Sequence, residues 1–135
     1  MNKIEGGCLC GEIKYYSKLD PLFTTVCHCS HCQRQAGTAF SIIIGVDRKS
    51  LHISGDLKCY EDIGNSGKPV YRKFCGNCGS PIISDVSAAP DLLFIKAGTI
   101  NNIKSLRPIK EIWTDHKLDC ITINGITEKH KTDGK

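Results

Sequence analysis

The 135-residue chain lacks the features that mark membrane and secreted proteins. No stretch of about 18 apolar residues occurs, so we expect no membrane-spanning helix. Met1 to Tyr16 contains no charged start followed by an apolar run, which a signal peptide would show. The sequence therefore predicts a cytoplasmic protein that does not bind a membrane.

Signs of nucleic-acid binding are also missing. The formal net charge is +4, but the basic residues do not cluster into a stripe. Cysteines that bind zinc do so as thiolates. A zinc ion with four thiolates has a net charge of −2 and one with three thiolates has −1, so two loaded sites would lower the net charge of the protein from +4 to +1. We therefore expect no nucleic-acid partner. The chain also has no Ser/His/Asp nucleophile pattern, Gly-rich phosphate loop or EF-hand sequence.

Aromatic residues are scarce, with one Trp and four Phe. The hydrophobic content of 40% permits one core, and metal cross-links would stabilise so loop-rich a chain. Nothing divides the sequence into two hydrophobic halves, so we expect a single domain over residues 1–127. Residues 128–135 are rich in Lys and also contain Asp133, and we expect them to form a flexible, solvated tail.

The hydrophobic pattern predicts a mainly β fold with short helical segments. Apolar runs separated by Gly, Pro, Asn and Asp predict strands over residues 12–16, 40–46, 51–54, 57–62, 70–74, 81–84, 92–97, 110–113 and 120–123. In the first of these strands, Ile13 and Tyr15 share one face. One helix is predicted over Ser30 to Ala36, with Ser30 as N-cap and Gly37 as stop signal.

Cysteine is abundant, with nine residues in all. In a reducing compartment, closely spaced cysteines are more often metal ligands than disulfides, and an odd number cannot pair completely. Seven of the nine form two sets that together predict two zinc ions. The first set comprises Cys8, Cys10, Cys75 and Cys78, and the second comprises Cys27, Cys29 and Cys32.

The first set predicts a closed, structural site. The segment from Cys75 to Gly79 has the form of a zinc knuckle, and Cys8 and Cys10 point to the same side of an extended chain. Four thiolates complete a tetrahedral zinc shell, which would join the N-terminal strand to a segment more than sixty residues later. Four unmetallated thiols or an iron–sulfur cluster are the open alternatives.

The second set predicts an open, catalytic site. Its three sulfurs come from a loop that enters the predicted helix, whose N-terminus would stabilise a thiolate. If water or substrate takes the fourth position, zinc can act as a Lewis acid or hold a substrate thiolate. The alternative is a second closed site. Its fourth ligand would then be His28, His31, Cys59, His116 or Cys120.

Three further residues have specific expectations. Cys59 and Cys120 lie in predicted strands, where a cysteine is most often a buried, inert thiol. Arg34 follows the last ligand of the second set and could pair with a substrate carboxylate in bidentate fashion. An arginine that is simply solvated on the helix surface is the alternative for this position.

Three segments of the chain resemble a known family. They are GGCLCGEIKY from Gly6, CHCSHCQRQAGTAF from Cys27 and FCGNCGSPI from Phe74. In this order they resemble the glutathione-dependent formaldehyde-activating enzyme family, also called the GFA or centromere protein V family. The resemblance implies a mainly β, Mss4-like zinc-binding fold, with a structural zinc on the first cysteine set and a catalytic zinc on the second.

The resemblance also implies an activity. The type reaction of the family is that of a carbon–sulfur lyase, which joins glutathione and formaldehyde reversibly as S-hydroxymethylglutathione. Zinc would hold the glutathione sulfur beside the aldehyde carbon. The chain departs from the family pattern in two ways: it is shorter than the characterised enzyme, and Cys120 stands where many relatives carry Trp. Another thiol adduct, as for many short relatives, is an alternative substrate. The competing functional class is a non-enzymatic zinc-binding or interaction module.

Overall fold

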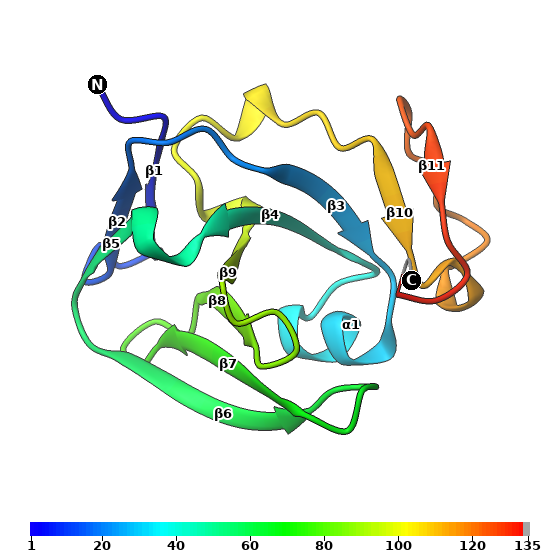
Figure 1. The fold of residues 1–135 in the computed structure, drawn as a ribbon, viewed down its shortest axis with the longest axis horizontal. Helices are drawn as coiled ribbons and strands as arrows, with labels where there is room; N and C mark the ends of the chain where they lie inside the picture. The colour runs from blue at the N-terminus through cyan, green and yellow to red at the C-terminus, as the bar shows by residue number, and fades with distance from the viewer. Residues whose placement is uncertain (134–135) are drawn as a thin grey trace.

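The computed structural model describes residues 1–133, which form eleven strands in two sheets (Figure 1). The small sheet has the order β1 (Ile4–Gly7), β2 (Lys14–Ser17) and β5 (Leu51–Ser54). The large sheet has the order β11 (Glu128–Lys129), β10 (Lys110–Ile112), β3 (Phe23–Cys27), β4 (Ser41–Asp47), β9 (Leu92–Lys96), β8 (Pro81–Val86), β7 (Pro69–Cys75) and β6 (Leu57–Ile63). The predicted mainly β fold is confirmed.

The core lies on one face of the large sheet. Cross-strand pairing aligns Ile44 of β4 with Ile95 of β9, and Ile95 with Ile83 of β8. These three side chains are almost fully buried and cluster with Ile13 and Tyr15 beside the small sheet. Burial of each such side chain contributes about 2 kcal/mol. The shared face predicted for Ile13 and Tyr15 is therefore confirmed as a core face.

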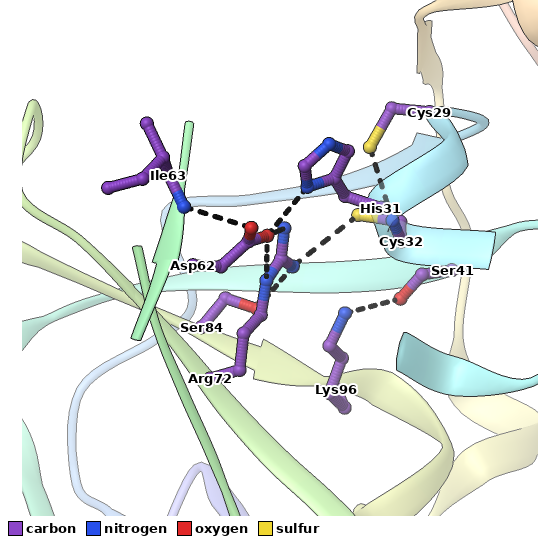
Figure 2. Close-up of polar contacts among 9 residues, drawn as sticks. All are labelled: Cys29, His31, Cys32, Ser41, Asp62, Ile63, Arg72, Ser84 and Lys96. Atoms are coloured by element: carbon purple, nitrogen blue, oxygen red, sulfur yellow. Dashed lines mark hydrogen bonds and ion pairs between the residues drawn. The ribbon is translucent and has the colours of Figure 1, made fainter. Parts of the chain in front are cut away.

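The opposite face of the large sheet carries charged and polar groups at its centre. Successive strand residues point to opposite faces, so the row one residue along from the core row lies on this side. That row aligns Arg72 of β7 with Ser84 of β8, and Ser84 with Phe94 of β9. Lys96 lies two residues beyond Phe94 and shares its face. Helix α1 (Ser30–Ala36) lies over these residues (Figure 2).

The bounds predicted for the helix are confirmed, and so is its stop signal. Gly37 has a φ of 69°, the left-handed conformation that glycine adopts readily, and its N–H donates to the carbonyl of Gln33 at 2.8 Å. The predicted N-cap is wrong. Cys29, and not Ser30, caps the helix, because the Cys29 sulfur accepts a hydrogen bond from the backbone N–H of Cys32 at 3.3 Å.

Eight of the nine predicted strands match strands of the structure, with bounds that differ by up to two residues. The ninth prediction, residues 120–123, is wrong, since this segment forms a turn followed by irregular chain. The backbone N–H of Ile121 donates to the carbonyl of Leu118, which closes that turn. The sequence pattern missed β1, β3 and β11.

The C-terminal segment covers the outer side of β10. Strand β11 pairs with β10 in parallel, and the backbone N–H of Trp113 donates to the carbonyl of Thr132 at 2.8 Å. The predicted tail therefore begins as a strand, while residues 134–135 lie outside the described residues. The domain boundary at residue 127 remains a prediction. Within residues 1–133, no helix has the length and apolar character needed to cross a membrane.

Candidate metal centres and active site

The four cysteines of the first set meet beside the core, and we call them the closed cluster. All four Sγ atoms lie within 4.8 Å of one another. The Cys8 and Cys10 sulfurs are 3.5 Å apart, and the Cys10 and Cys75 sulfurs are 3.8 Å apart. A zinc ion bonded to four sulfurs at about 2.3 Å requires sulfur–sulfur separations of about 3.8 Å. The donor set and its spacing therefore fit zinc.

Several hydrogen bonds hold the closed cluster in place. Ile13 donates its backbone N–H to the Cys8 sulfur at 3.2 Å, and Cys78 does so to the Cys75 sulfur at 3.5 Å. The side chain and backbone of Ser80 form hydrogen bonds that lower the pKa of Cys78 to about 5. Cys75 itself is fully buried in the hydrophobic cluster. The closed cluster is thus continuous with the core.

The three cysteines of the second set also come together, and we call them the open cluster. Cys27 ends β3, Cys29 caps helix α1, and Cys32 lies in the first turn of that helix. Their Sγ atoms lie within 4.8 Å of one another. Within residues 1–133, no further His, Cys, Asp or Glu joins this group. Three thiolates can bind zinc and leave one coordination position for an outside ligand.

Two of the candidate fourth ligands are engaged elsewhere. The Nε2 atom of His28 lies 3.1 Å from a carboxylate oxygen of Glu111, and both side chains are almost completely buried. The Nδ1 atom of His31 lies 2.7 Å from a carboxylate oxygen of Asp62. Each histidine is thus hydrogen-bonded to a carboxylate and lies outside the sulfur cluster.

The other three candidates also lie outside the open cluster. Cys59 and Cys120 are exposed, so the prediction that they are buried thiols is wrong. Cys59 belongs to β6 at the outer edge of the large sheet, and Cys120 lies in a turn. His116 lines the cavity beside the open cluster without joining the sulfur group.

A buried arginine lies against the open cluster (Figure 2). Arg72 directs one N–H group to the Cys32 sulfur at 3.8 Å and to the hydroxyl of Ser84 at 3.3 Å. Its other terminal nitrogen lies 3.2 Å from Asp62. Burial alone raises the pKa of Asp62, but hydrogen bonds from His31 and Arg72 outweigh it, and the net pKa is lowered. Asp62 therefore balances the arginine charge.

The surroundings of Cys32 favour its ligand form. Hydrogen bonds from Cys27 and Cys29 lower the pKa of Cys32, and the positive charges of Lys96 and Arg72 lower it further against the effect of burial. A thiolate is the form of cysteine that binds a metal. The open cluster is therefore a fitting donor set for zinc.

A cavity of about 580 Å³ lies beside the open cluster. Its apolar wall includes Phe23, Ile43, Val70, Val86, Phe94, Ile112 and Trp113, and its polar lining includes the three cysteines with His31, Arg72, Ser84, Lys110 and His116. Phe23 packs so tightly on Gly45 that a Cβ atom there would overlap its ring. The cavity is wide enough for a small organic substrate.

A buried ion-pair network supports the loop of the open cluster from behind. Glu111 is fully buried and accepts from His28, and the Lys117 ammonium lies 3.0 Å from the same carboxylate oxygen. Burial lowers the pKa of His28, although the Glu111 charge opposes this shift. The backbone N–H of His28 also donates to the carbonyl of Ile112 at 3.1 Å. The network thus fixes the segment between Cys27 and Cys29 to β10.

Arg34, the predicted substrate partner, is exposed on helix α1 and does not line this cavity. The basic residues that do line it are Arg72 and Lys110, together with the histidines His31 and His116. Arg72 is not among the site residues predicted from the sequence. Its position two residues after Val70, in a strand with one buried face, is the signal that could have identified it.

The fold and the two clusters define a mainly β protein with two candidate metal centres. The family model of the glutathione-dependent formaldehyde-activating enzymes matches residues 3–116. The chain belongs to this family, which confirms the resemblance noted from its motifs. A search of curated proteins finds no match.

A solved structure supports the fold. The crystal structure of a protein from Rhodobacter sphaeroides superposes with a TM-score of 0.57 at 20% sequence identity, over 73% of this chain and 88% of the other. At this identity the likeness concerns the fold alone. The Mss4-like architecture implied by the resemblance remains a prediction.

Proposed function

We propose that the protein is a zinc-dependent carbon–sulfur lyase that joins a small thiol reversibly to formaldehyde or another small aldehyde. Glutathione is the first candidate for the thiol. The proposal rests on one observation, the open cluster with three ligands in the wall of a cavity of about 580 Å³. Membership of the family supports the choice of substrates.

The proposal assigns different roles to the two clusters. The closed cluster holds a structural zinc ion, and Cys27, Cys29 and Cys32 hold a catalytic one. When bound, the catalytic zinc supplies a Lewis acid that keeps the substrate sulfur in its thiolate form. The three cysteines line the cavity, so a thiol bound there would be within reach of an ion that they held. Because closely spaced cysteines stay reduced only in a reducing compartment, we propose that the protein acts in the cytoplasm.

The reaction needs no oxidant or reductant. The thiol sulfur forms a bond to the aldehyde carbon, the carbon–oxygen π bond breaks, and the oxygen takes up the proton that the thiol loses. A thiol and an aldehyde that are bound together in the cavity gain in rate because they meet in one place. One N–H group of Arg72 lies beside Cys32, and we expect the arginine charge to stabilise the negative charge that develops on the aldehyde oxygen.

The carboxylates of glutathione need a cationic partner. Lys110 lines the cavity, and its side chain is one-third exposed, with Glu128 at 3.5 Å. Arg34 remains the partner predicted from sequence. We expect a small thiol as substrate and neither a nucleic-acid nor a membrane partner.

The decisive experiment compares Cys29→Ala with Cys59→Ala. NMR exchange spectroscopy measures the rate at which glutathione and formaldehyde interconvert with their adduct, above the spontaneous rate. We expect Cys29→Ala to lose this acceleration and keep one zinc ion, while Cys59→Ala, which lacks an exposed thiol outside both clusters, keeps parental activity. Parental turnover in Cys29→Ala contradicts the proposal.

A negative result with the parent protein has a different meaning. If it accelerates no exchange and binds no glutathione at millimolar concentration, the zinc-binding or interaction module becomes the better description. Zinc analysis of the same sample then tells whether the clusters are loaded.

A further inference from the structure

Four charged side chains within residues 1–133 are buried: Arg72, Asp85, Lys96 and Glu111. Three of them have an oppositely charged partner. Arg72 pairs with Asp62, Asp85 with Arg48 and Lys73, and Glu111 with Lys117. Lys96 is the exception, because no carboxylate of the described residues lies within ion-pair distance of its ammonium. A buried charge without a counter-ion is costly.

The surroundings of Lys96 indicate where its counter-ion lies. Its Nζ donates to the hydroxyl of Ser41 at 3.0 Å, and Ser41 pairs directly with Cys27 across β3 and β4. Figure 2 shows the ammonium beneath the helix that carries Cys32. Burial, with a smaller effect from Arg72, lowers the pKa of Lys96, although negative charge on Cys32, and more weakly on Cys27 and Cys29, opposes this shift.

We infer that Lys96 is the counter-ion of the open cluster and strengthens its binding of zinc. The inference rests on the proposed assignment of the open cluster as a zinc site. Three thiolates and one Zn²⁺ leave a net charge of −1 in a largely buried place, and the single ammonium of Lys96 neutralises it. Arg72 also contacts the Cys32 sulfur, but its charge is offset by its ion pair with Asp62, whereas Lys96 has no carboxylate partner among the described residues.

The closed cluster is held by other groups. The Cys8 and Cys75 sulfurs accept backbone N–H groups, the Cys78 sulfur lies 3.3 Å from the Ser80 hydroxyl, and Cys10 is exposed to water. The effect of Lys96 should therefore be confined to one of the two zinc ions. An effect on only one zinc ion distinguishes a counter-ion from a residue that supports the fold as a whole.

The test measures zinc affinity by chelator competition in Lys96→Met, Lys96→Arg and the control Lys73→Met. Met matches the shape of the lysine stem without its charge, and Lys73 is a partly exposed lysine of β7 that pairs with Asp85. We expect Lys96→Met to weaken the zinc affinity of the open cluster by about 10- to 100-fold, as removal of an outer partner of a metal site does. The zinc affinity of the closed cluster should stay unchanged. Lys96→Arg should retain most of the affinity, and Lys73→Met all of it.

Melting curves of the one-zinc form check that the variant folds. In this form Lys96→Met should unfold cooperatively, with a melting temperature close to that of the parent. If it does not fold, Lys96→Gln takes its place with the same expected loss of affinity.

Two outcomes overturn the inference: unchanged affinity for the second zinc in the neutral variant, or equal weakening of both zinc ions. In either case the proposed function stands if the parent binds two zinc ions. A parent that binds only one zinc ion defeats both.

Discussion

The two cysteine clusters use the same ligand atom in different surroundings. The closed cluster has four sulfurs, joins segments 65 residues apart and includes a fully buried cysteine of the hydrophobic core. The open cluster has three sulfurs within six residues and lies on the opposite side of the large sheet, facing a cavity. The number of ligands and the neighbouring groups, and not the residue type, distinguish a cross-link from a reactive centre.

The neighbours of the two clusters differ as much as their ligand counts. The closed cluster is surrounded by backbone donors and apolar side chains. The open cluster is surrounded by charge, with Arg72 and Lys96 on the sheet below it and Glu111 behind its loop. Fixed charges near a metal affect how the metal binds and activates a substrate, whereas apolar neighbours mainly affect the stability of the fold.

The largest effect is expected from Cys75→Ala. Loss of this ligand opens the closed cluster and removes the metal-binding energy that supports folding, so the protein should lose one zinc ion and melt at least about 10 °C lower, or fail to fold. Zinc analysis and thermal melting measure both effects. Cys29→Ala is the matched control, and a Cys75→Ala protein that keeps both zinc ions and its melting temperature contradicts the structural role.

A smaller effect is expected from Lys117→Ala. The change leaves the buried Glu111 carboxylate without its cation, which should lower the free energy of unfolding by about 3 kcal/mol. Urea unfolding of the two-zinc protein measures it. Lys49→Ala removes an exposed lysine in the turn after β4 and should stay within about 0.5 kcal/mol of the parent. Equal values for the two variants would show that the network adds nothing.

Two substitutions, one beside the open cluster and one at a remote ion pair, test how stability depends on pH. Asp62 and Asp85 both have a lowered pKa, against the effect of burial, because Asp62 accepts hydrogen bonds from His31 and Arg72 and Asp85 accepts them from Arg48. A carboxyl whose folded pKa is lowered stabilises the protein above its unfolded pKa of about 4, and this contribution is lost as pH falls through the folded pKa. Asp62→Asn and Asp85→Asn should therefore both melt lower than the parent at pH 7.

The two variants should differ in metal retention. Asp62→Asn leaves Arg72 unbalanced beside Cys32 and should change retention of the second zinc, while Asp85→Asn should not. For each variant, the difference in melting temperature from the parent should become smaller below about pH 4. A gap that widens in acid contradicts the lowered pKa values.

The smallest effect is expected from Arg34→Ala. Arg34 is exposed and lies outside the cavity lining, so glutathione affinity should change less than twofold. Lys110→Ala should weaken it about threefold, because Lys110 lines the cavity but is partly screened by water. Isothermal titration with glutathione measures both. A larger loss in Arg34→Ala restores the role predicted from sequence.

The sequence predicted the cysteine clusters well because their spacing is local and chemically restrictive. A C-x-C or C-x-x-C pair brings two sulfurs to one side of a turn whatever the rest of the chain does. The helix was predicted for a similar reason, since Gly37 ends it with a conformation that other residues rarely adopt. Its N-cap was missed because a cysteine sulfur replaced the usual oxygen acceptor.

The surroundings of the open cluster could not be predicted in the same way. Arg72, Lys96 and Glu111 come from strands β7, β9 and β10, and only the order of strands in the sheet brings them near the cluster. Strand β3 was missed although Phe23–Cys27 is rich in β-branched residues, because it ends inside the cysteine motif. The false strand at residues 120–123 shows that a short apolar run alone does not define a strand.

The most direct test of the difference between the clusters is zinc X-ray absorption of the two-zinc protein, before and after addition of glutathione. A closed site with four sulfurs and an open site with three give an average of about 3.5 sulfur ligands per zinc, with a nitrogen or oxygen ligand making up the rest. We predict that glutathione raises the average to about four and that S-methylglutathione leaves it unchanged. An average of four sulfurs before glutathione is added, or no change on its addition, would contradict the account.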